Sequence, residues 1–197
     1  MEADADAELM LKAAAGEKEA FATLFDRYQA SVARFAYRFV GDKARAEELA
    51  QEIFLRLYRS AKRYRASAKF RTFLFRVATN CCLNEVRRWE YHVSRSITEA
   101  GDPSEIESVA ADDARPDQSL DGLELEAAVG AALREMSPRE RAAFAMCRFE
   151  GMPYREIAVA LSSSEAAVKS LIHRATLAVA RRIETLEAGT EPARSPA

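Results

Sequence analysis

The sequence predicts an all-α protein with two small helical domains joined by an acidic flexible linker, and three observations lead to this. Apolar residues recur at three- and four-residue steps, the period of a helix, and no segment shows strand alternation with hairpin turns. Glycine and proline are scarce, 7 and 6 in 197 residues, and the glycines fall mostly where a helical period breaks. A stretch at 96–121 is acidic and poor in apolar residues, which is typical of a linker.

The first half of the chain predicts three helices. One runs to about Val40 and is stopped by Gly41. Asp42 is a good N-cap for the next helix, which carries an apolar stripe on one side. A polar, basic stretch at 62–69 follows, and a third helix is expected at 70–89. This half therefore reads as a compact helical bundle.

The second half carries the clearest local signals. Ser137 and Glu140 form a capping box at the start of a helix that ends at Gly151. A short helix at 154–161, a serine-rich turn and a longer helix at 165–186 follow, which is the helix-turn-helix pattern, with a plain helical hairpin as the alternative. Five apolar residues are expected to fill the angle between these two helices: Ile157, Ala158, Leu161, Val168 and Ile172.

The net charge of −2 conceals blocks of opposite sign. Residues 54–95 hold 11 basic and 2 acidic residues, a net charge of +9, and aromatic residues lie between the cations. Residues 96–126 hold 1 basic and 10 acidic residues, a net charge of −9. The basic block offers cations for phosphates and flat rings for unpaired bases, so it indicates single-strand binding, with a solvated helix face as the alternative.

Other classes of protein find little support in the sequence. Cys81, Cys82 and Cys147 form neither a zinc pattern nor an even disulfide framework, so we expect buried free thiols. His92 and His173 fit no catalytic or metal-binding pattern, so we expect no enzyme activity, no metal and no cofactor. The start of the chain is acidic and no apolar run reaches membrane-spanning length, so we expect a cytoplasmic protein.

Five segments in this order and spacing resemble bacterial RNA polymerase sigma factors of the extracytoplasmic-function (ECF) group of the sigma-70 family. The segments are 16–28, 46–54, 70–88, 133–140 and 151–175. Ser162 stands where the family usually has a glycine in the helix-turn-helix. The resemblance implies a sigma factor that binds core polymerase and directs promoter-specific initiation of transcription.

The resemblance also implies a division of the chain. Residues 1–95 would form region 2, which binds core polymerase and recognises and melts the −10 element. Residues 96–121 would form the acidic linker, as a simple spacer or a mimic of nucleic acid. Residues 122–187 would form region 4, whose helix-turn-helix reads the −35 element, and 188–197 a disordered tail.

The resemblance places three groups of binding residues. The residues expected to bind core polymerase are Glu48, Gln51, Glu52 and Phe54. Those expected at the melted −10 element are Tyr64, Lys69, Phe70, Arg71, Thr72, Phe73, Arg76, Asn80, Arg87 and Arg88, although Phe73 is at least as well explained as a core residue. Those expected at the −35 element are Arg155, Ser164, Glu165, Ala166, Lys169, Ser170, His173 and Arg174.

The implied partners are the beta-prime clamp and beta flap of core RNA polymerase, promoter DNA both as duplex and as melted non-template strand, and an anti-sigma factor. No membrane insertion is expected. The alternative function is a stand-alone helix-turn-helix regulator that binds duplex DNA without polymerase. A helical scaffold without a DNA role is a further alternative, but it leaves the +9 block unexplained.

Overall fold

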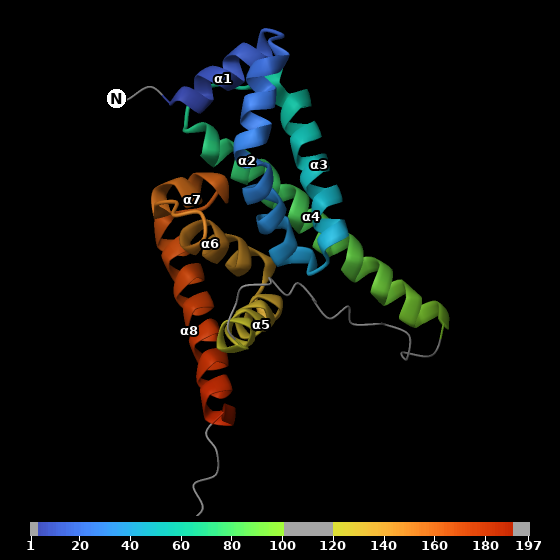
Figure 1. Ribbon diagram of the computed structural model, residues 1–197. Coiled ribbons are helices and arrows are strands. Elements are labelled where there is room, and N and C mark those ends of the chain that lie inside the picture. The colour runs from blue at the N-terminus through green and yellow to red at the C-terminus, as the bar shows by residue number, and fades with distance from the viewer. Residues whose placement is uncertain (1–3, 101–119, 191–197) are drawn as a thin grey trace, which may run out of the picture.

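The computed structural model describes residues 4–100 and 120–190 (Figure 1). Within these residues the regular structure is entirely helical, which confirms the predicted fold class. The elements are α1 Ala5–Ala14, α2 Lys18–Val40, α3 Lys43–Ser60, the 3₁₀ helix η1 Ala61–Arg63, α4 Phe70–Ala100, α5 Leu120–Glu135, α6 Pro138–Arg148, α7 Tyr154–Ala160 and α8 Glu165–Thr190. Most of the predicted linker and tail, residues 101–119 and 191–197, lie outside the described residues.

Helices α1 to α4 form the first bundle, in which α2 packs against α1, α3 and α4. Its centre is aromatic and aliphatic, with Phe35 and Phe75 fully buried in edge contact at 5.2 Å between ring centroids. Gly41 ends α2 with φ at +70°, a left-handed conformation that favours glycine. Asp42 then caps α3 by accepting from the Arg45 amide at 2.6 Å, as predicted.

Two features of this bundle extend beyond the sequence prediction. The short helix α1 precedes the predicted ones, and its N-cap Asp4 accepts from the Asp6 amide at 3.2 Å. The same carboxylate accepts from the Phe70 amide at 2.6 Å, so it also satisfies a free donor at the start of α4. Helix α4 continues beyond Trp89 to Ala100, and its C-terminal half projects past the other helices in Figure 1.

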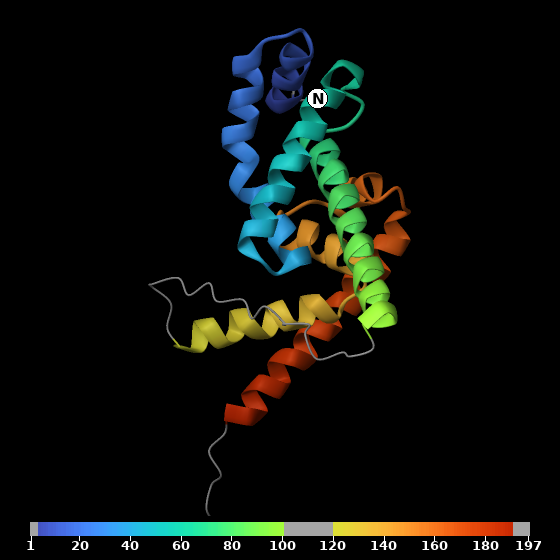
Figure 2. The ribbon, with the colours of Figure 1, turned by 90° about the vertical axis from the view of Figure 1, so that its right-hand side faces the viewer.

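Helices α5 to α8 form the second half. Ser137 accepts from the Glu140 amide, and the Glu140 carboxylate accepts from the Ser137 amide at 3.2 Å, which confirms the capping box. A small apolar cluster containing Leu133, Phe144 and Ala175 joins α5, α6 and α8. Helix α8 crosses α5 and extends away from the rest of the molecule (Figure 2).

The two halves pack directly against each other, because α2 and α4 contact helices of the second half. The main apolar core is continuous across this junction. Arg141 of α6 is buried, and its guanidinium donates to the Phe39 and Arg38 carbonyls at 3.1 and 3.4 Å. The Arg38 guanidinium in turn lies 3.7 Å from the centroid of the Phe149 ring. Burial lowers the pKa of Arg38 to about 10. These contacts make the two predicted domains one body in this structure.

The three cysteines are free, as the sequence predicts. Cys81 and Cys82 are buried on α4, and burial raises the pKa of both thiols, for Cys82 strongly. Cys147 is half-buried. A thiol with a raised pKa holds little thiolate at neutral pH, so the buried pair is poorly placed to sense oxidants.

Candidate nucleic-acid interface

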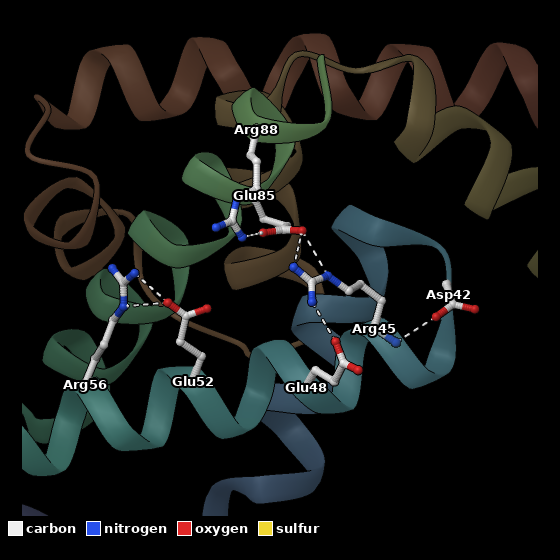
Figure 3. A network of polar contacts seen from close by, with 7 residues as sticks. All are labelled: Asp42, Arg45, Glu48, Glu52, Arg56, Glu85 and Arg88. Carbon is white, nitrogen blue, oxygen red and sulfur yellow. Dashed lines mark hydrogen bonds and ion pairs between the residues drawn. The ribbon is translucent and has the colours of Figure 1, made fainter. Parts of the chain in front are cut away.

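One face of α3 carries acidic residues that are already paired with arginines (Figure 3). Arg45 donates to Glu48 at 2.6 Å and to Glu85 of α4 at 2.6 and 2.9 Å. Arg56 donates to Glu52 at 2.5 and 3.0 Å. The Glu48 and Glu52 side chains remain 65% and 43% exposed, so a basic partner can still reach them. Surface pairs of this kind contribute little stability and exchange partners readily.

Beside these acids lies a shallow apolar hollow between α2 and α3. Gln51 is exposed at its rim, whereas the Phe54 ring is 4% exposed and packs edge-on against Phe25 at 4.8 Å between ring centroids. Leu55 and Tyr58, which are 54% and 46% exposed, also line this hollow and are not among the predicted core-binding residues. The signal that could have identified them is that both are large apolar residues directly beside the predicted core-binding residues. The residues lining the hollow are Phe21, Phe25, Gln51, Phe54, Leu55 and Tyr58.

Helix α4 carries an exposed polar stripe. Lys69, directly before the helix, and Arg76, Asn80 and Arg87 within it are all exposed. At about 100° per residue, the three helical positions fall within about 40° of one another on the helix surface. Arg88 is also exposed and lies 3.6 Å from Glu85. The stripe therefore presents cations on both sides of one amide side chain along a single face.

The remaining predicted −10 residues are less accessible. Tyr64, Phe70 and Thr72 are 4%, 0% and 2% exposed, so in this structure their side chains serve packing. Phe73 is half-buried, in ring contact with Tyr64 at 5.1 Å between centroids, and the Arg76 guanidinium lies 5.4 Å from its centroid. Direct DNA contact by the three buried residues stays a prediction.

The helix-turn-helix forms as predicted. The five residues expected between its helices are 0% to 6% exposed. Ser162 in the turn has φ at +49°, a left-handed conformation that glycine adopts more readily than serine. Ser164 caps α8 by accepting from the Ala167 amide at 3.2 Å. All eight residues predicted to read DNA are exposed: Arg155, Ser164, Glu165, Ala166, Lys169, Ser170, His173 and Arg174.

Arg174 on the reading helix is held by Glu140 of α6, with its Nε donating to the carboxylate at 2.5 Å. Desolvation acts to raise the pKa of Glu140, but hydrogen bonds from Arg174 and Ser137 outweigh it, so the pKa lies below its ordinary value. The carboxylate thus links the capping box of α6 to α8 and fixes where one cation of the reading helix lies.

The described residues contain no group of three or more His, Cys, Asp and Glu side chains placed to hold a metal ion. Within the same ranges, no helix combines the length and the apolar character needed to cross a membrane.

Comparison with known proteins agrees with this geometry. Residues 24–90 match the family Sigma-70 region 2, and residues 126–179 match Sigma-70, region 4. The chain is 37% identical to the ECF RNA polymerase sigma factor SigE of Mycolicibacterium smegmatis over 143 residues, 73% of this chain and 53% of that protein. It is 30% identical to the RNA polymerase sigma-H factor of Pseudomonas aeruginosa over 183 residues, 92% of this chain and 95% of that protein. The chain thus spans about half of the first relative and nearly all of the second.

Solved structures share the fold. The sigma factor RpoE of Bartonella quintana, solved with the anti-sigma factor NepR, has a TM-score of 0.68 at 20% identity, with 83% of this chain and 96% of that chain covered. CnrH, solved with the cytosolic domain of CnrY, has a TM-score of 0.67 at 22% identity, with 92% and 99% covered. Together with the sequence matches, these findings assign the chain to the ECF group of the sigma-70 family of RNA polymerase sigma factors.

Proposed function

We propose that the chain carries out promoter-specific initiation of transcription with core RNA polymerase through three separate surfaces. The exposed acids of α3 and the adjoining apolar hollow bind the beta-prime clamp. The α4 stripe captures the melted −10 element, and the start of α8 reads the −35 element as duplex. Residues 1–95 act as region 2 and 122–187 as region 4.

The α4 stripe is the observation that carries this proposal. Arg76 and Arg87 supply cations for phosphates on either side of Asn80, and an amide can both donate to and accept from the edge of an unpaired base. Duplex DNA hides such an edge within base pairs, so an amide flanked by cations suits a strand that has already been opened. A stand-alone regulator of duplex DNA has no need of this arrangement.

The start of α8 forms the proposed surface for the −35 element. Lys169, Ser170 and His173 lie on the exposed face of a helix that its partner α7 supports from behind, which is how a recognition helix enters the major groove. Arg155 and Arg174 are the cations expected to contact phosphates beside it.

The remaining partners follow from the family. The beta flap is the proposed partner of region 4, and an anti-sigma factor is the proposed regulator. The proposal gives the chain no catalytic step, because phosphodiester chemistry belongs to the polymerase, and it implies a cytoplasmic location beside the chromosome.

Run-off transcription tests the proposal. Core polymerase with and without the full chain is assayed on genomic fragments, and the new start sites are mapped. Start sites that need the chain and share two spaced elements support the sigma function. Binding to duplex DNA without polymerase, together with no new transcripts, would overturn the proposal in favour of the stand-alone regulator.

A template opened in advance at the −10 element separates the two DNA surfaces. Substitutions in the α4 stripe are expected to reduce transcription more on the closed template than on the opened one, because the stripe's binding energy offsets the cost of melting. Substitutions in α8 are expected to reduce both equally.

A further inference from the structure

The α4 stripe has an aromatic residue at its far end. Tyr91 follows Arg87 by four residues, so at about 100° per residue it lies within about 40° of Arg87 on the helix surface. Tyr91 is 65% exposed, the highest value among the large apolar residues of the described ranges. Its ring meets the ring of its neighbour His92 edge-on, with 6.1 Å between centroids. The stripe therefore continues into a ring that faces solvent.

The exposure of Trp89, two residues earlier, has a different origin. Trp89 is 63% exposed, but it follows the fully buried Cys82 by seven residues and so lies within about 20° of the direction in which α4 packs. It continues the packed side of the helix beyond the edge of the bundle, where α4 projects past the other helices (Figure 1). Tyr91 lies about 160° from Trp89 around the helix, so packing does not account for it.

Two cations flank the Tyr91 ring. Its direction on the helix falls between those of Arg87 and Arg88, which lie within about one turn before it. Both arginines are exposed, and Arg88 is 3.6 Å from Glu85 with its own side chain still 64% exposed. The neighbouring acid Glu90 points about 100° away from Tyr91. The surroundings of the ring therefore carry a net positive charge.

An exposed ring between two arginines suits an unpaired nucleotide. The ring can stack on the face of a base, and the guanidinium groups can pair with the phosphates on either side of that base. In duplex DNA the faces of the bases are covered by their neighbours in the stack, so the ring finds no such partner there. An apolar protein surface would cover the ring but leave the two guanidinium groups without partners.

The length of α4 between Asn80 and Tyr91 sets where such a base lies. The two residues are separated by about 16 Å along the helix axis, at about 1.5 Å per residue. A strand whose bases stay stacked carries one phosphate per about 3.4 Å, so this distance spans about five nucleotides. A strand that follows the stripe meets Asn80 with one base and Tyr91 with another.

We propose that Tyr91 is a stacking platform for an unpaired base of the melted −10 strand, about five nucleotides from the base that Asn80 contacts. The inference rests on the proposed function, because it assigns the α4 stripe to that strand. Stacking accepts every base, so Tyr91 adds affinity for opened DNA without adding sequence preference. Asn80 recognises a base edge, whereas Tyr91 holds the strand further along the helix.

The test uses the holoenzyme, assembled from core polymerase and the full chain, on a template opened in advance at the −10 element. Fluorescent aminopurine replaces one base at a time along the opened non-template strand, and its fluorescence falls when it stacks on a ring. We expect Tyr91→Ala to restore fluorescence about five nucleotides from the position that Asn80→Ala affects most. We also expect Tyr91→Ala to weaken binding of the opened template about tenfold.

Two variants serve as controls. Trp89→Ala removes an equally exposed aromatic residue from the other side of the same helix, and we expect it to change neither the fluorescence nor the affinity for the template. Tyr91→Phe keeps the ring and removes the hydroxyl, so we expect its affinity to stay within about twofold of the unsubstituted chain. Affinity for core polymerase alone is expected to be the same for all of these chains.

Equal losses for Tyr91→Ala and Trp89→Ala would overturn the inference, as would unchanged fluorescence and affinity in Tyr91→Ala. Weaker binding of core polymerase by Tyr91→Ala would assign the ring to a protein partner, which also contradicts the proposal. Failure of the proposed function is a separate result, because in that case the unsubstituted chain itself supports no run-off transcription.

Discussion

The two DNA-facing regions of this molecule differ in what surrounds them. The start of α8 stands free, with Lys169 and His173 exposed on a helix whose own core is complete. The start of α4 is bonded to the other half of the chain through Glu150 and Glu156. The difference matches the proposed targets. A helix surface that recognises duplex DNA can be fully formed and exposed in the free protein. A cluster of cations for single-stranded DNA binds other anions unless its charges are paired.

The largest expected effect comes from a substitution in the core that supports the exposed face of α8. Ile172→Ala deletes a side chain that is 3% exposed behind the reading face of α8, so we expect a loss of about 2–4 kcal/mol in the free energy of unfolding. Urea unfolding followed by circular dichroism measures it. Leu177→Ala on the same helix is the control, because Leu177 is 44% exposed and should cost much less. Equal losses would mean that this face of α8 is not packed as described.

The second effect acts on the α4 stripe. Arg76→Ala combined with Asn80→Ala removes one cation and the central amide, so we expect transcription from a closed promoter to fall about 10- to 100-fold while stability changes little. Run-off transcription and urea unfolding measure the two quantities. The matched control is Arg59→Ala, an exposed arginine of α3 within the same basic block. A similar loss of transcription from Arg59→Ala would mean that the net positive charge of the block, and not the α4 stripe, accounts for the effect.

A third effect is visible only in acid, and it concerns the link between Glu140 and α8. Hydrogen bonds from Arg174 and Ser137 favour the ionised carboxylate and hold its pKa below the unfolded value of about 4.3. The stabilisation is therefore complete above that value and is lost as the pH falls through the lower folded-state pKa. Glu140→Gln should show less of this acid loss. Urea midpoints across the acid range measure the difference, with Glu135→Gln as the control, and parallel curves for all three chains would contradict it.

The smallest effect is a gain in stability. Ser162 adopts φ of +49°, where a side chain costs about 1 kcal/mol and glycine does not. Ser162→Gly should raise the free energy of unfolding by at most about 1 kcal/mol, because glycine also gains entropy in the unfolded chain. Thermal unfolding measures this, and duplex binding should be unchanged. A fall in stability would show that the Ser162 side chain itself supports the turn.

The sequence predicted individual helices better than their assembly. The period of apolar residues located α2 and α3, and the capping box of Ser137 located the start of α6. The end of α4 was placed too early, because Glu90, Tyr91 and His92, which follow Trp89, are exposed and give no buried apolar position from which to extend the helical period. Helix α1 was missed because its buried face is built from small residues and one methionine, Met10, around a cap at Asp4.

In the candidate site, too, local features could be predicted from the sequence and contacts between distant segments could not. Exposure of the α8 reading face followed directly from the helix-turn-helix pattern. The closed junction did not, because Arg71 and Glu150 are 79 positions apart and nothing in the local sequence of either specifies the other. Burial of Arg141 was equally hidden, since an arginine is seldom buried and its partners here are backbone carbonyls, which any residue supplies.

The two bonds made by Asp4 have a consequence for genetics. One carboxylate holds both the start of α1 and the Phe70 amide at the head of α4. Asp4 is acidic and is not itself a candidate for DNA contact. An Asp4→Ala allele recovered in a screen would nevertheless score as a promoter-melting defect, and suppressors would be expected near residue 70 rather than near residue 4.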